Sequence, residues 1–472
     1  MQPRPMTPPL PPTTRRQWLN TAAGALASSV LARQAFSQDL GARPPERPAG
    51  TTVLNPRGRV PVSIIIDDST CLVNLNKFAV PQFAAVSDRY GIYNWRSWPD
   101  EIPDDFVRKF ADWAGENGVK GKYSIVPYPA CVGRLDGELP GWTHREVAAS
   151  IRVVQERIMP NWDIHPEMVT HTRVINTKTG HPYPERSMKF MENWDWSVNR
   201  SVDELTDYLS YALTILKNVG LPCEGVTTPG GFGSRARPQL AQATLESCRS
   251  VFNAEIPHYF RDLHAEGTES VAPKVYYASG LGTEDPRCSV SILGCTGDWT
   301  GGWNNTPPEG VDKFITADLQ SGRLVDVIGR AEPAIMVCHW TGIHWNGQEL
   351  GFKIFQEVVR RLHQRYDHLV WMKLSEIARY WAAKELTTIT TAADGAIHLE
   401  APYHCPQFTL QVPAVQAPAA PRHVMGDKIV PFKEVAGPLD LQSGTWTAAA
   451  AHLTVCFDLP KGRSTLRLLP HP

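Results

Sequence analysis

The sequence predicts an α/β fold: a parallel sheet, closed or nearly closed into a barrel, followed by a small all-β, sandwich-like domain. Three observations support this prediction. Strand and helix patterns alternate about seven times between residues 60 and 386, as in repeated βα units. Residues 62–66 form an apolar, β-branched run, which is typical of a strand covered on both faces. From residue 387 to 472, short strand patterns broken by Pro, Gly and Asp replace the helices.

An open, doubly wound sheet is the alternative arrangement. The dinucleotide-binding folds of that kind carry Gly-x-Gly-x-x-Gly after their first strand. This sequence has no such motif after residues 62–67, so a nucleotide site at that strand is not expected.

Start and stop signals fix the order of the elements. Pro103 opens the first helix, and capping boxes at Thr143 with Glu146 and at Ser201 with Glu204 open the next two. The other predicted helices are 238–248, 311–328, 349–364 and 375–384. The predicted strands are 62–67, 122–126, 168–170, 225–227, 250–256, 290–293, 335–338 and 369–372, and in the last domain 387–391, 397–399, 408–412, 446–447 and 453–455.

The first 37 residues resemble a twin-arginine export signal. Arg15-Arg16 precedes a weakly apolar run at residues 21–32, and small residues at 35–37 suit a cleavage site. The run is shorter than the roughly 20 residues that span a bilayer. We therefore expect a signal peptide at 1–37, a linker at 38–59, and an exported protein, periplasmic or secreted, with no membrane span in the mature chain.

Composition excludes some classes of partner. Lys and Arg total 47 against 48 Asp and Glu, a formal net charge of −1, which argues against a nucleic-acid-binding protein. The nine cysteines include no Cys-x-x-Cys pair, so a zinc knuckle is not expected. No pattern in the sequence assigns an oligomeric state.

Polar residues follow four of the predicted strands. They are Asp67-Asp68, the segment that holds Glu167 and His171, the turn Thr227-Thr228-Pro229-Gly230-Gly231, and His339. The carboxyl ends of parallel strands meet at one edge of a sheet, where catalytic groups gather. Carboxylates and imidazoles at separate strand ends meet the needs of metal-assisted hydrolysis, in which a carboxylate activates water and a histidine protonates the leaving group.

The two adjacent acids have a simpler interpretation as well. Asp68-Ser69-Thr70 also suits a strand end that is followed by a helix cap or an Asx-turn. If both carboxylates share one site, one pKa must rise unless a metal or another cation intervenes.

The motifs resemble those of the polysaccharide deacetylases, the NodB-type carbohydrate esterases. Ile66-Asp67-Asp68 matches the first motif, Glu167 to His171-Thr172 the second, Thr227-Thr228-Pro229-Gly230-Gly231 the third, and Cys338-His339 the last. The resemblance covers residues 60–385 and implies a distorted (β/α)7 barrel that acts on an acylated carbohydrate. It implies that Asp67 is the catalytic base, Asp68 and His171 ligate a divalent metal (zinc or similar), and His339 is the acid.

Two positions depart from that pattern. The second metal-binding histidine of the family falls on Ile175, which cannot ligate, and the arginine that steadies the base falls on Thr227. Catalytic zinc usually has three protein ligands, so another group must complete the site if a metal binds. The candidates for additional ligands or support are His165, Glu167, Asn176 and His181.

Further residues are candidates for binding the substrate. Tryptophans on long loops can stack on sugars, although tryptophan is more often part of a core. The candidates are Thr228, Gly230, Trp194, Asp195, Trp299, Trp303, Trp340 and His344.

The leading hypothesis is an exported hydrolase that removes an acyl group, such as acetyl, from a sugar by means of a divalent metal. One alternative is a degenerate barrel that binds glycan without turnover, which the residues at Ile175 and Thr227 would explain. The other is a metal-independent glycoside hydrolase, whose acid and base would come from Asp67, Asp68, Asp195 and Asp298.

Overall fold

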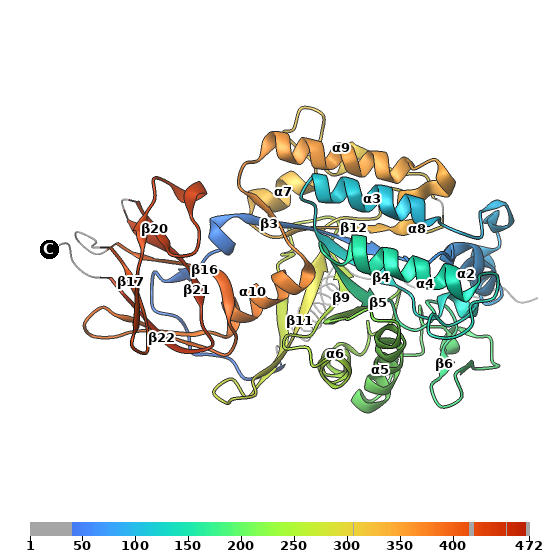
Figure 1. Ribbon diagram of the computed structural model, residues 1–472, viewed down its shortest axis with the longest axis horizontal. Helices are drawn as coiled ribbons and strands as arrows, with labels where there is room; N and C mark the ends of the chain where they lie inside the picture. The colour runs from blue at the N-terminus through green and yellow to red at the C-terminus, as the bar shows by residue number, and fades with distance from the viewer. Residues whose placement is uncertain (1–39, 305, 415–419, 450, 469–472) are drawn as a thin grey trace, which may run out of the picture. The chain divides into compact units, whose positions relative to one another are not determined.

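The central strand of the first domain is β3 (Val60–Asp67), which is buried along its whole length. The computed structural model describes residues 40–304, 306–414, 420–449 and 451–468, and Figure 1 shows the arrangement of their helices and strands. Residues 1–39, which contain the expected export signal, lie outside the described residues. The chain from Gly41 onward forms one unit.

Parallel strands surround β3, as its apolar sequence predicts. β12 (Ala334–His339) and β4 (Gly121–Ile125) both pair with β3 in parallel, and β5 (Trp162–Pro166) pairs with β4. In the β3–β12 register, Asp67 lies opposite His339, so the last residues of the two strands are neighbours. β13 (Leu369–Trp371) pairs with the beginning of β3.

A second sheet continues the first. It contains β8 (Gly225–Thr227), β9 (His258–Leu263) and β11 (Arg287–Gly294), which are parallel, and the antiparallel β10 (Lys274–Ser279). A bridge between Glu167 and Thr227 joins the sheets on one side, and the Cys295 N–H donates to the Ile335 carbonyl at 2.7 Å on the other. The described strands therefore form two sheets of mainly parallel strands, which contact each other at both edges. They do not form one continuous closed ladder.

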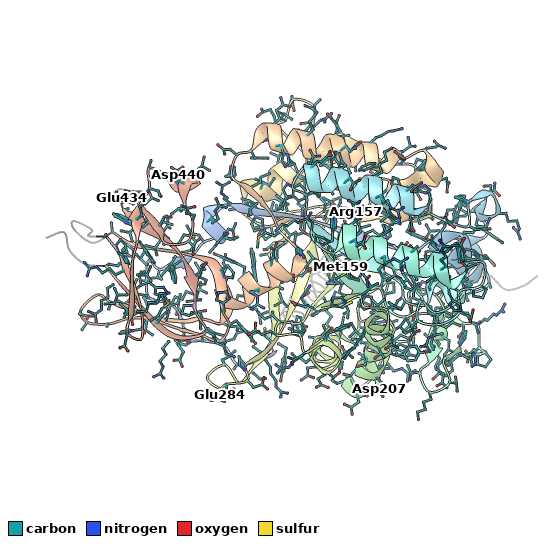
Figure 2. The ribbon with its side chains drawn as sticks, in the orientation of Figure 1. Arg157, Met159, Asp207, Glu284, Glu434 and Asp440 are labelled. Carbon is teal, nitrogen blue, oxygen red and sulfur yellow. The ribbon has the colours of Figure 1, made fainter. Side chains whose placement is uncertain are left out.

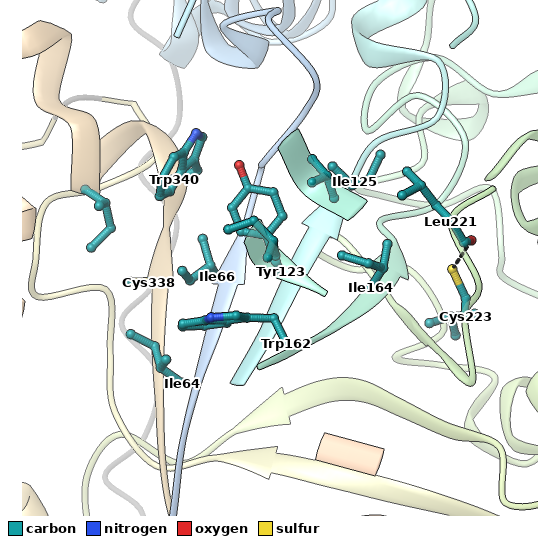
Figure 3. Packing of buried hydrophobic residues seen from close by; sticks show 14 of the residues in the cluster. Ile64, Ile66, Tyr123, Ile125, Trp162, Ile164, Leu221, Cys223, Cys338 and Trp340 are labelled. Carbon is teal, nitrogen blue, oxygen red and sulfur yellow. Dashed lines mark hydrogen bonds between the residues drawn. The ribbon is translucent and has the colours of Figure 1, made fainter. Parts of the chain in front are cut away.

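Helices cover the outer face of these strands. They are α2 (Leu75–Ala84), α3 (Asp104–Glu116), α4 (His144–Val153), α5 (Val202–Asn218), α6 (Arg237–Phe252), α7 (Arg323–Gly329), α8 (Trp340–His344), α9 (Leu350–Arg365) and α10 (Leu374–Leu386). The capping boxes expected at Thr143 and Ser201 open α4 and α5. Figure 3 shows Ile64 and Ile66 of β3 with Tyr123, Trp162 and Trp340 in the core.

The alternation of side chains along β3 and β4 places polar groups inside. Ile64 and Ile66 belong to the core under the helices, whereas Ile65 belongs to a second apolar cluster, with Val337 and Ile292. Successive strand residues face opposite sides, so Asp67 faces the same side as Ile65. The inner side therefore carries the chemistry at the carboxyl end of β3.

After α10 the chain forms two mainly antiparallel sheets. One sheet contains β14 (Thr388–Thr391), β15 (Ile397–Ala401), β22 (Gly462–Arg467), β17 (Arg422–Met425) and β18 (Lys428–Pro431). The other contains β19 (Lys433–Glu434), β20 (Thr445–Ala449), β21 (His452–Leu459), β16 (Cys405–Pro413) and β2 (Thr52–Val53). Apolar residues of both sheets share one core, the arrangement of a β-sandwich. β2 comes from the expected linker, so part of that segment is a strand of this sandwich.

Three predicted elements are wrong. The strand predicted at 168–170 lies earlier, at β5, because Pro166 ends the ladder and the following residues bend. The strand predicted at 250–256 is the end of α6 and a loop, since Asn253 caps the helix with φ +55°. The helix predicted at 311–328 is broken before α7, and in the break the Thr316 and Asp318 side chains hydrogen-bond the backbone near residues 320 and 321.

The outer surface carries charges of both signs. Figure 2 labels Arg157, Asp207, Glu284, Glu434 and Asp440, all of which are exposed. No helix within the described ranges is long and apolar enough to cross a membrane. All nine cysteines are free thiols in the structure.

Candidate active site

The carboxyl ends of the parallel strands line a common cavity. Asp67 at the end of β3, Glu167 after β5, Thr228 after β8 and His339 at the end of β12 all lie on its wall, and its volume is about 460 Å³. A second cavity of the same volume lies near α10 and β16 and contains none of these residues. The topology thus brings together the side chains that the strand-end argument selected.

Asp68, Glu167 and His171 form a buried cluster beside this cavity. His171 Nε2 lies 2.8 Å from Asp68 Oδ1 and 3.3 Å from Glu167 Oε1. One potential ligand atom from each residue lies within 4.8 Å of the others. Glu167 is therefore placed as a third donor, the position for which the sequence offered four candidates.

The donor set of this cluster fits a divalent cation. Within the described part of the chain, neither buried oxygen of Asp68 receives a well-aligned hydrogen bond, and the nearest charged group is His171, whose Nε2 lies 2.8 Å from Oδ1. Two carboxylates and a neutral imidazole would balance a charge of +2, and all three are ligands that zinc accepts. Once His171 has lost its proton, lone pairs of all three side chains converge, which is the arrangement a cation site requires.

Protonation of His171 competes with a cation. Burial works to lower the pKa of His171, but the charges of Asp68 and Glu167 outweigh it and hold that pKa well above its ordinary value. Burial works to raise the pKa of Glu167 and of Asp68, and the His171 charge lowers both. Cation binding therefore requires the loss of the His171 proton, because a ligating imidazole must be neutral.

Backbone hydrogen bonds to buried carboxylates hold two strained positions of this cluster in place. Asp68 and His171 both have φ +62°, a left-handed conformation that non-glycine residues seldom adopt. The Asp68 N–H donates to Glu167 Oε2 at 2.7 Å, and the His171 N–H donates to Glu192 Oε2 at 2.6 Å. Glu192 also accepts from the N–H groups of Val169 and Thr170 and from the hydroxyl of Tyr208.

Asp67 is bound by a buried lysine. Lys122 Nζ donates to Asp67 Oδ1 and lies 2.7 Å from Ser124 Oγ. Lys122 is fully buried and comes from β4, beside β3. Burial raises the pKa of Asp67 above its ordinary value, and the Lys122 charge opposes that rise. Lys122 thus supplies the positive charge that Thr227 cannot.

His339 is oriented by Asp298. His339 Nδ1 lies 2.8 Å from Asp298 Oδ2, which also accepts the Trp303 N–H at 3.1 Å. Although burial works in the opposite direction, Asp298 raises the pKa of His339 to about 10. The imidazole is therefore protonated at neutral pH, and among the described residues its Nε2–H is not shared.

A cluster of aromatic rings from Phe83, Tyr90, Trp194 and Trp303 forms one wall of the cavity beside these groups. Phe83 of α2 lies between Trp194 and Trp303, with ring centroids 5.5 and 5.6 Å apart, and Tyr90 is 5.8 Å from both tryptophans. Trp194 and Trp303 were candidate substrate contacts, and both are half-buried on the cavity wall. No pattern in the sequence predicted α2, so Phe83 and Tyr90 were not among the candidate residues.

The turn after β8 forms another part of the wall. Thr228 and Gly230 line the cavity, as expected, and the Thr228 N–H donates to the Phe260 carbonyl at 3.1 Å. Gly230 has φ +46°, and a Cβ there would lie 2.7 Å from the Asn193 carbonyl oxygen. Only glycine allows this approach to the segment that carries Trp194.

Three candidate ligands lie elsewhere. His165 is buried in β5, and its Nε2 lies 3.0 Å from His258 Nε2, so it belongs to a different cluster. Asn176 and His181 pair in the hairpin of β6 (Ile175–Asn176) and β7 (His181–Pro182), where His181 is exposed. Neither hairpin residue lines the cavity.

Four candidate substrate residues do not line the cavity either. Trp299 packs on Phe314 in the core with centroids 5.1 Å apart, and Trp340 is buried under α3. His344 is buried against Phe106, and Asp195 is exposed and paired with Arg235. The tryptophans at 299 and 340 follow the ordinary preference of tryptophan for a core.

The sequence contained a signal for Lys122. It stands in an apolar strand pattern, Gly121-Lys122-Tyr123-Ser124-Ile125, at a position that alternation places inside, and a buried lysine requires a partner. No comparable signal identified Glu192, because its role depends on hydrogen bonds to residues that are distant from it in the sequence. The carboxylate lies 21 residues from His171 in the chain.

Comparisons with known proteins give a limited result. No family model matches the chain, and no curated protein does. The chain is similar to a solved structure from Mycobacterium smegmatis described as a polysaccharide deacetylase, with 14% identity and a TM-score of 0.37 over 75% of this chain and 99% of that one. A Pseudomonas aeruginosa PAO1 structure of the same description has 10% identity and a TM-score of 0.36 over 69% and 91%.

A xylanase of glycoside hydrolase family 30 from Clostridium acetobutylicum is more distant, with 9% identity and a TM-score of 0.24 over 77% of this chain and 92% of that one. The first two descriptions name the family that the sequence motifs resemble. Because all three TM-scores are below 0.5, they support no inference about function. The case for a function depends on the residues in the cavity.

Proposed function

We propose that this protein is an exported hydrolase that removes an acyl group from a carbohydrate with the help of a divalent metal. The observation that supports the proposal best is the convergence of three arrangements at one cavity. These are the Asp68–Glu167–His171 cluster, the Lys122-bound Asp67, and the Asp298-bound His339. Each arrangement provides one of the functions that hydrolysis of an acyl group requires.

In this proposal Asp67 is the general base. Its Oδ1 is held by Lys122, and the carboxylate lies on the cavity wall, where it can take a proton from water. Its raised pKa makes it a stronger base than an exposed aspartate. A cation held by Asp68, Glu167 and His171 would polarise the acyl carbonyl and acidify the water.

His339 is the general acid. Asp298 accepts from Nδ1 and so fixes the tautomer and the direction of the ring, which leaves the Nε2 proton for the leaving oxygen or nitrogen of the sugar. The aromatic rings of Trp194 and Trp303 provide faces on which a sugar ring can stack.

The arrangement gives less support to a glycoside hydrolase. Asp195 is exposed and pairs with Arg235, and Asp298 is bound to His339. Asp67 and Asp68 are adjacent in the chain, but each is bound to a different cation, Lys122 and His171. Two free carboxylates on opposite sides of a sugar, which glycoside hydrolysis requires, are not found among these four.

The proposal also includes the division of the chain. Residues 1–37 direct export by the twin-arginine route to the periplasm or the medium, residues 60–386 form the catalytic domain, and residues 387–472 form the accessory β domain. The Arg-Arg motif and the change of pattern after residue 386 support this division.

The base is tested by Asp67→Asn. We expect this variant to lose acetate release from acetylated xylo- and chito-oligosaccharides by about 100-fold or more, the scale of general base catalysis, while it keeps its metal content. Asp195→Asn, at an exposed position outside the cavity, is the matched control and should keep full activity. Full activity of Asp67→Asn would refute the assignment, and so would the absence of acetate release from native protein that contains metal.

A further inference from the structure

Arg261 occupies an unusual position in β9. Phe260 pairs with Ile292 and Asp262 pairs with Leu293 in the neighbouring strand, so Arg261 is the extra residue of a β-bulge. Bulges redirect a side chain and are frequent beside active sites. Arg261 lines the cavity that Asp67 and His339 line.

The guanidinium of Arg261 has no partner within the described residues. Its Nε is buried without a hydrogen bond. The acidic neighbour in the chain, Asp262, is bound by Arg237 through two hydrogen bonds of 2.9 and 3.2 Å. Desolvation lowers the pKa of Arg261, and the charges that act on it are those of Asp262 and Arg237.

The carboxylates of the site do not neutralise Arg261. Asp67 is bound by Lys122, Asp298 by His339, and Asp68 and Glu167 both face His171. A half-buried cation without an anion is costly, because desolvation is not repaid by an ion pair. An anionic ligand in the cavity would remove that cost.

A second arginine adds to the positive charge of the same cavity. Arg89 lines it, with its guanidinium 4.6 Å from the centroid of the Tyr90 ring, to whose hydroxyl it donates. Arg89 is exposed, so it can adjust to a ligand, whereas Arg261 is fixed by the bulge. The two arginines leave the substrate part of the cavity cationic.

From this geometry we propose that Arg261 binds a negatively charged oxyanion of the sugar, so the substrate is an acidic glycan that carries carboxylates or sulfate esters. The proposal deepens the proposed function and rests on it for the acyl group that is removed. A planar guanidinium matches the two oxygens of a carboxylate, and such charge-assisted pairs are stronger than neutral hydrogen bonds. The aromatic wall would hold the sugar ring while Arg261 selects its charge.

The test measures binding without turnover. Isothermal titration of the metal-loaded protein compares unacetylated trigalacturonate, a sulfated galactose trisaccharide and neutral galactotriose at low ionic strength. We expect at least one acidic sugar to bind about tenfold or more tightly than the neutral sugar. In Arg261→Met the ratio of the acidic-sugar affinity to the neutral-sugar affinity should fall several-fold, with Arg89 still present, and in Arg261→Lys it should lie between the native and Met values.

Arg287→Met is the matched control, because Arg287 is exposed on the neighbouring β11 and pairs with Asp285. This variant should keep the native ratio, and thermal unfolding of all three variants shows whether they fold. Equal binding of acidic and neutral sugars by the native protein overturns the proposal, as does a preference that Arg261→Met leaves undiminished. Tighter binding of trigalacturonate would indicate that the oxyanion is a carboxylate, and tighter binding of the sulfated trisaccharide would indicate a sulfate ester. Failure of the hydrolase proposal would appear separately, as no acetate release from any sugar.

Discussion

Asp67 and Asp68 are neighbours in the chain with opposite electrostatic environments. Burial raises the pKa of Asp67, against the charge of Lys122, whereas the charge of His171 overcomes burial and lowers the pKa of Asp68. The left-handed φ of Asp68 turns the chain at the strand end, so the two side chains meet different partners. Two carboxylates whose pKa values are driven apart suit two roles, a base and a ligand.

At the scale of single residues, the sequence indicated which residues belong to the site better than it indicated which residues they contact. The pattern indicated Asp67, Asp68, His171 and His339, and the structure brings all four to one region. It did not identify Lys122 as the partner of Asp67, because the contact joins residues 55 positions apart. The nearest partner of His171 also depended on how the chain bends after β5. The sequence alone did not select it from the four candidates His165, Glu167, Asn176 and His181.

The dyad of His339 and Asp298 leads to a pH prediction. A general acid works while it is protonated, and Asp298 raises the pKa of His339 to about 10, so native activity should persist to about that pH and fall above it. In Asp298→Asn the largest of the charges that raise the pKa of His339 is gone, while those of Asp68 and Asp67 remain. The alkaline limb of kcat should therefore move to lower pH, toward the ordinary histidine value of about 6.5.

The measurement is a profile of kcat against pH for native protein, Asp298→Asn and the exposed control Asp195→Asn. The control should retain the native profile, since Asp195 pairs with Arg235 outside the cavity. An unchanged alkaline limb in Asp298→Asn would show that His339 is not the acid.

At the scale of elements, the connection between β5 and α5 carries most of the site. It holds Glu167, His171, Glu192 and Trp194, and its regular structure consists of the short hairpin of β6 and β7 and one 3-10 turn at Met188–Phe190. The sequence predicted a strand in this connection because Met168-Val169-Thr170 is apolar and β-branched. The actual constraint is Glu192, whose carboxylate takes the place of a ladder for three successive N–H groups.

Glu192→Ala tests this constraint. The change leaves the N–H groups of Val169, Thr170 and His171 without an acceptor in a buried place, at about 1–3 kcal/mol for each unsatisfied group. We expect the free energy of unfolding to fall by about 3 kcal/mol or more, and metal affinity to fall as well, because His171 loses its position.

Glu185→Ala is the control, since Glu185 is exposed in the same connection and accepts a hydrogen bond from the Ser187 hydroxyl. Denaturant unfolding and metal titration should show it to be close to native. A Glu192→Ala protein with native stability and metal affinity would contradict the role of the carboxylate.

The elements that were predicted well are those with local signals. The capping boxes of α4 and α5 and the apolar run of β3 depend on residues close in sequence, and all three are present. The helix predicted at 311–328 is broken, and the cause is also local, because residues within the segment favour a turn over a helix. Gly322, with φ +110°, and the Thr316 hydroxyl divert the backbone into a turn before α7.

At the scale of the whole molecule, the β-sandwich shares a core with the α/β part. Ile377 and Trp381 of α10 belong to the same apolar cluster as Ile389 and Phe457 of the sandwich and Val290 of β11. The Tyr380 hydroxyl also joins the parts, since it donates to the Leu54 carbonyl and accepts from the Thr409 N–H. The sequence predicted the two kinds of architecture from periodicity, but periodicity does not indicate which faces share a core.

A shared core predicts cooperative unfolding. Ile389→Asp places a carboxylate without a partner in the apolar cluster, so we expect the free energy of unfolding to fall by about 3 kcal/mol or more. Thr391→Asp, on the same strand but exposed, should have little effect. Calorimetry should show one transition, shifted as a whole in Ile389→Asp, and a second transition left at the native temperature would contradict the shared core.

The central claim is that Asp68, Glu167 and His171 together hold a divalent cation. Anomalous diffraction at the zinc edge, from crystals of protein loaded with zinc, tests it most directly. We expect one strong peak about 2.0–2.3 Å from a ligand atom of each of these three residues. A peak at the other cluster, between His165 and His258, or no peak beside Asp68, would contradict it.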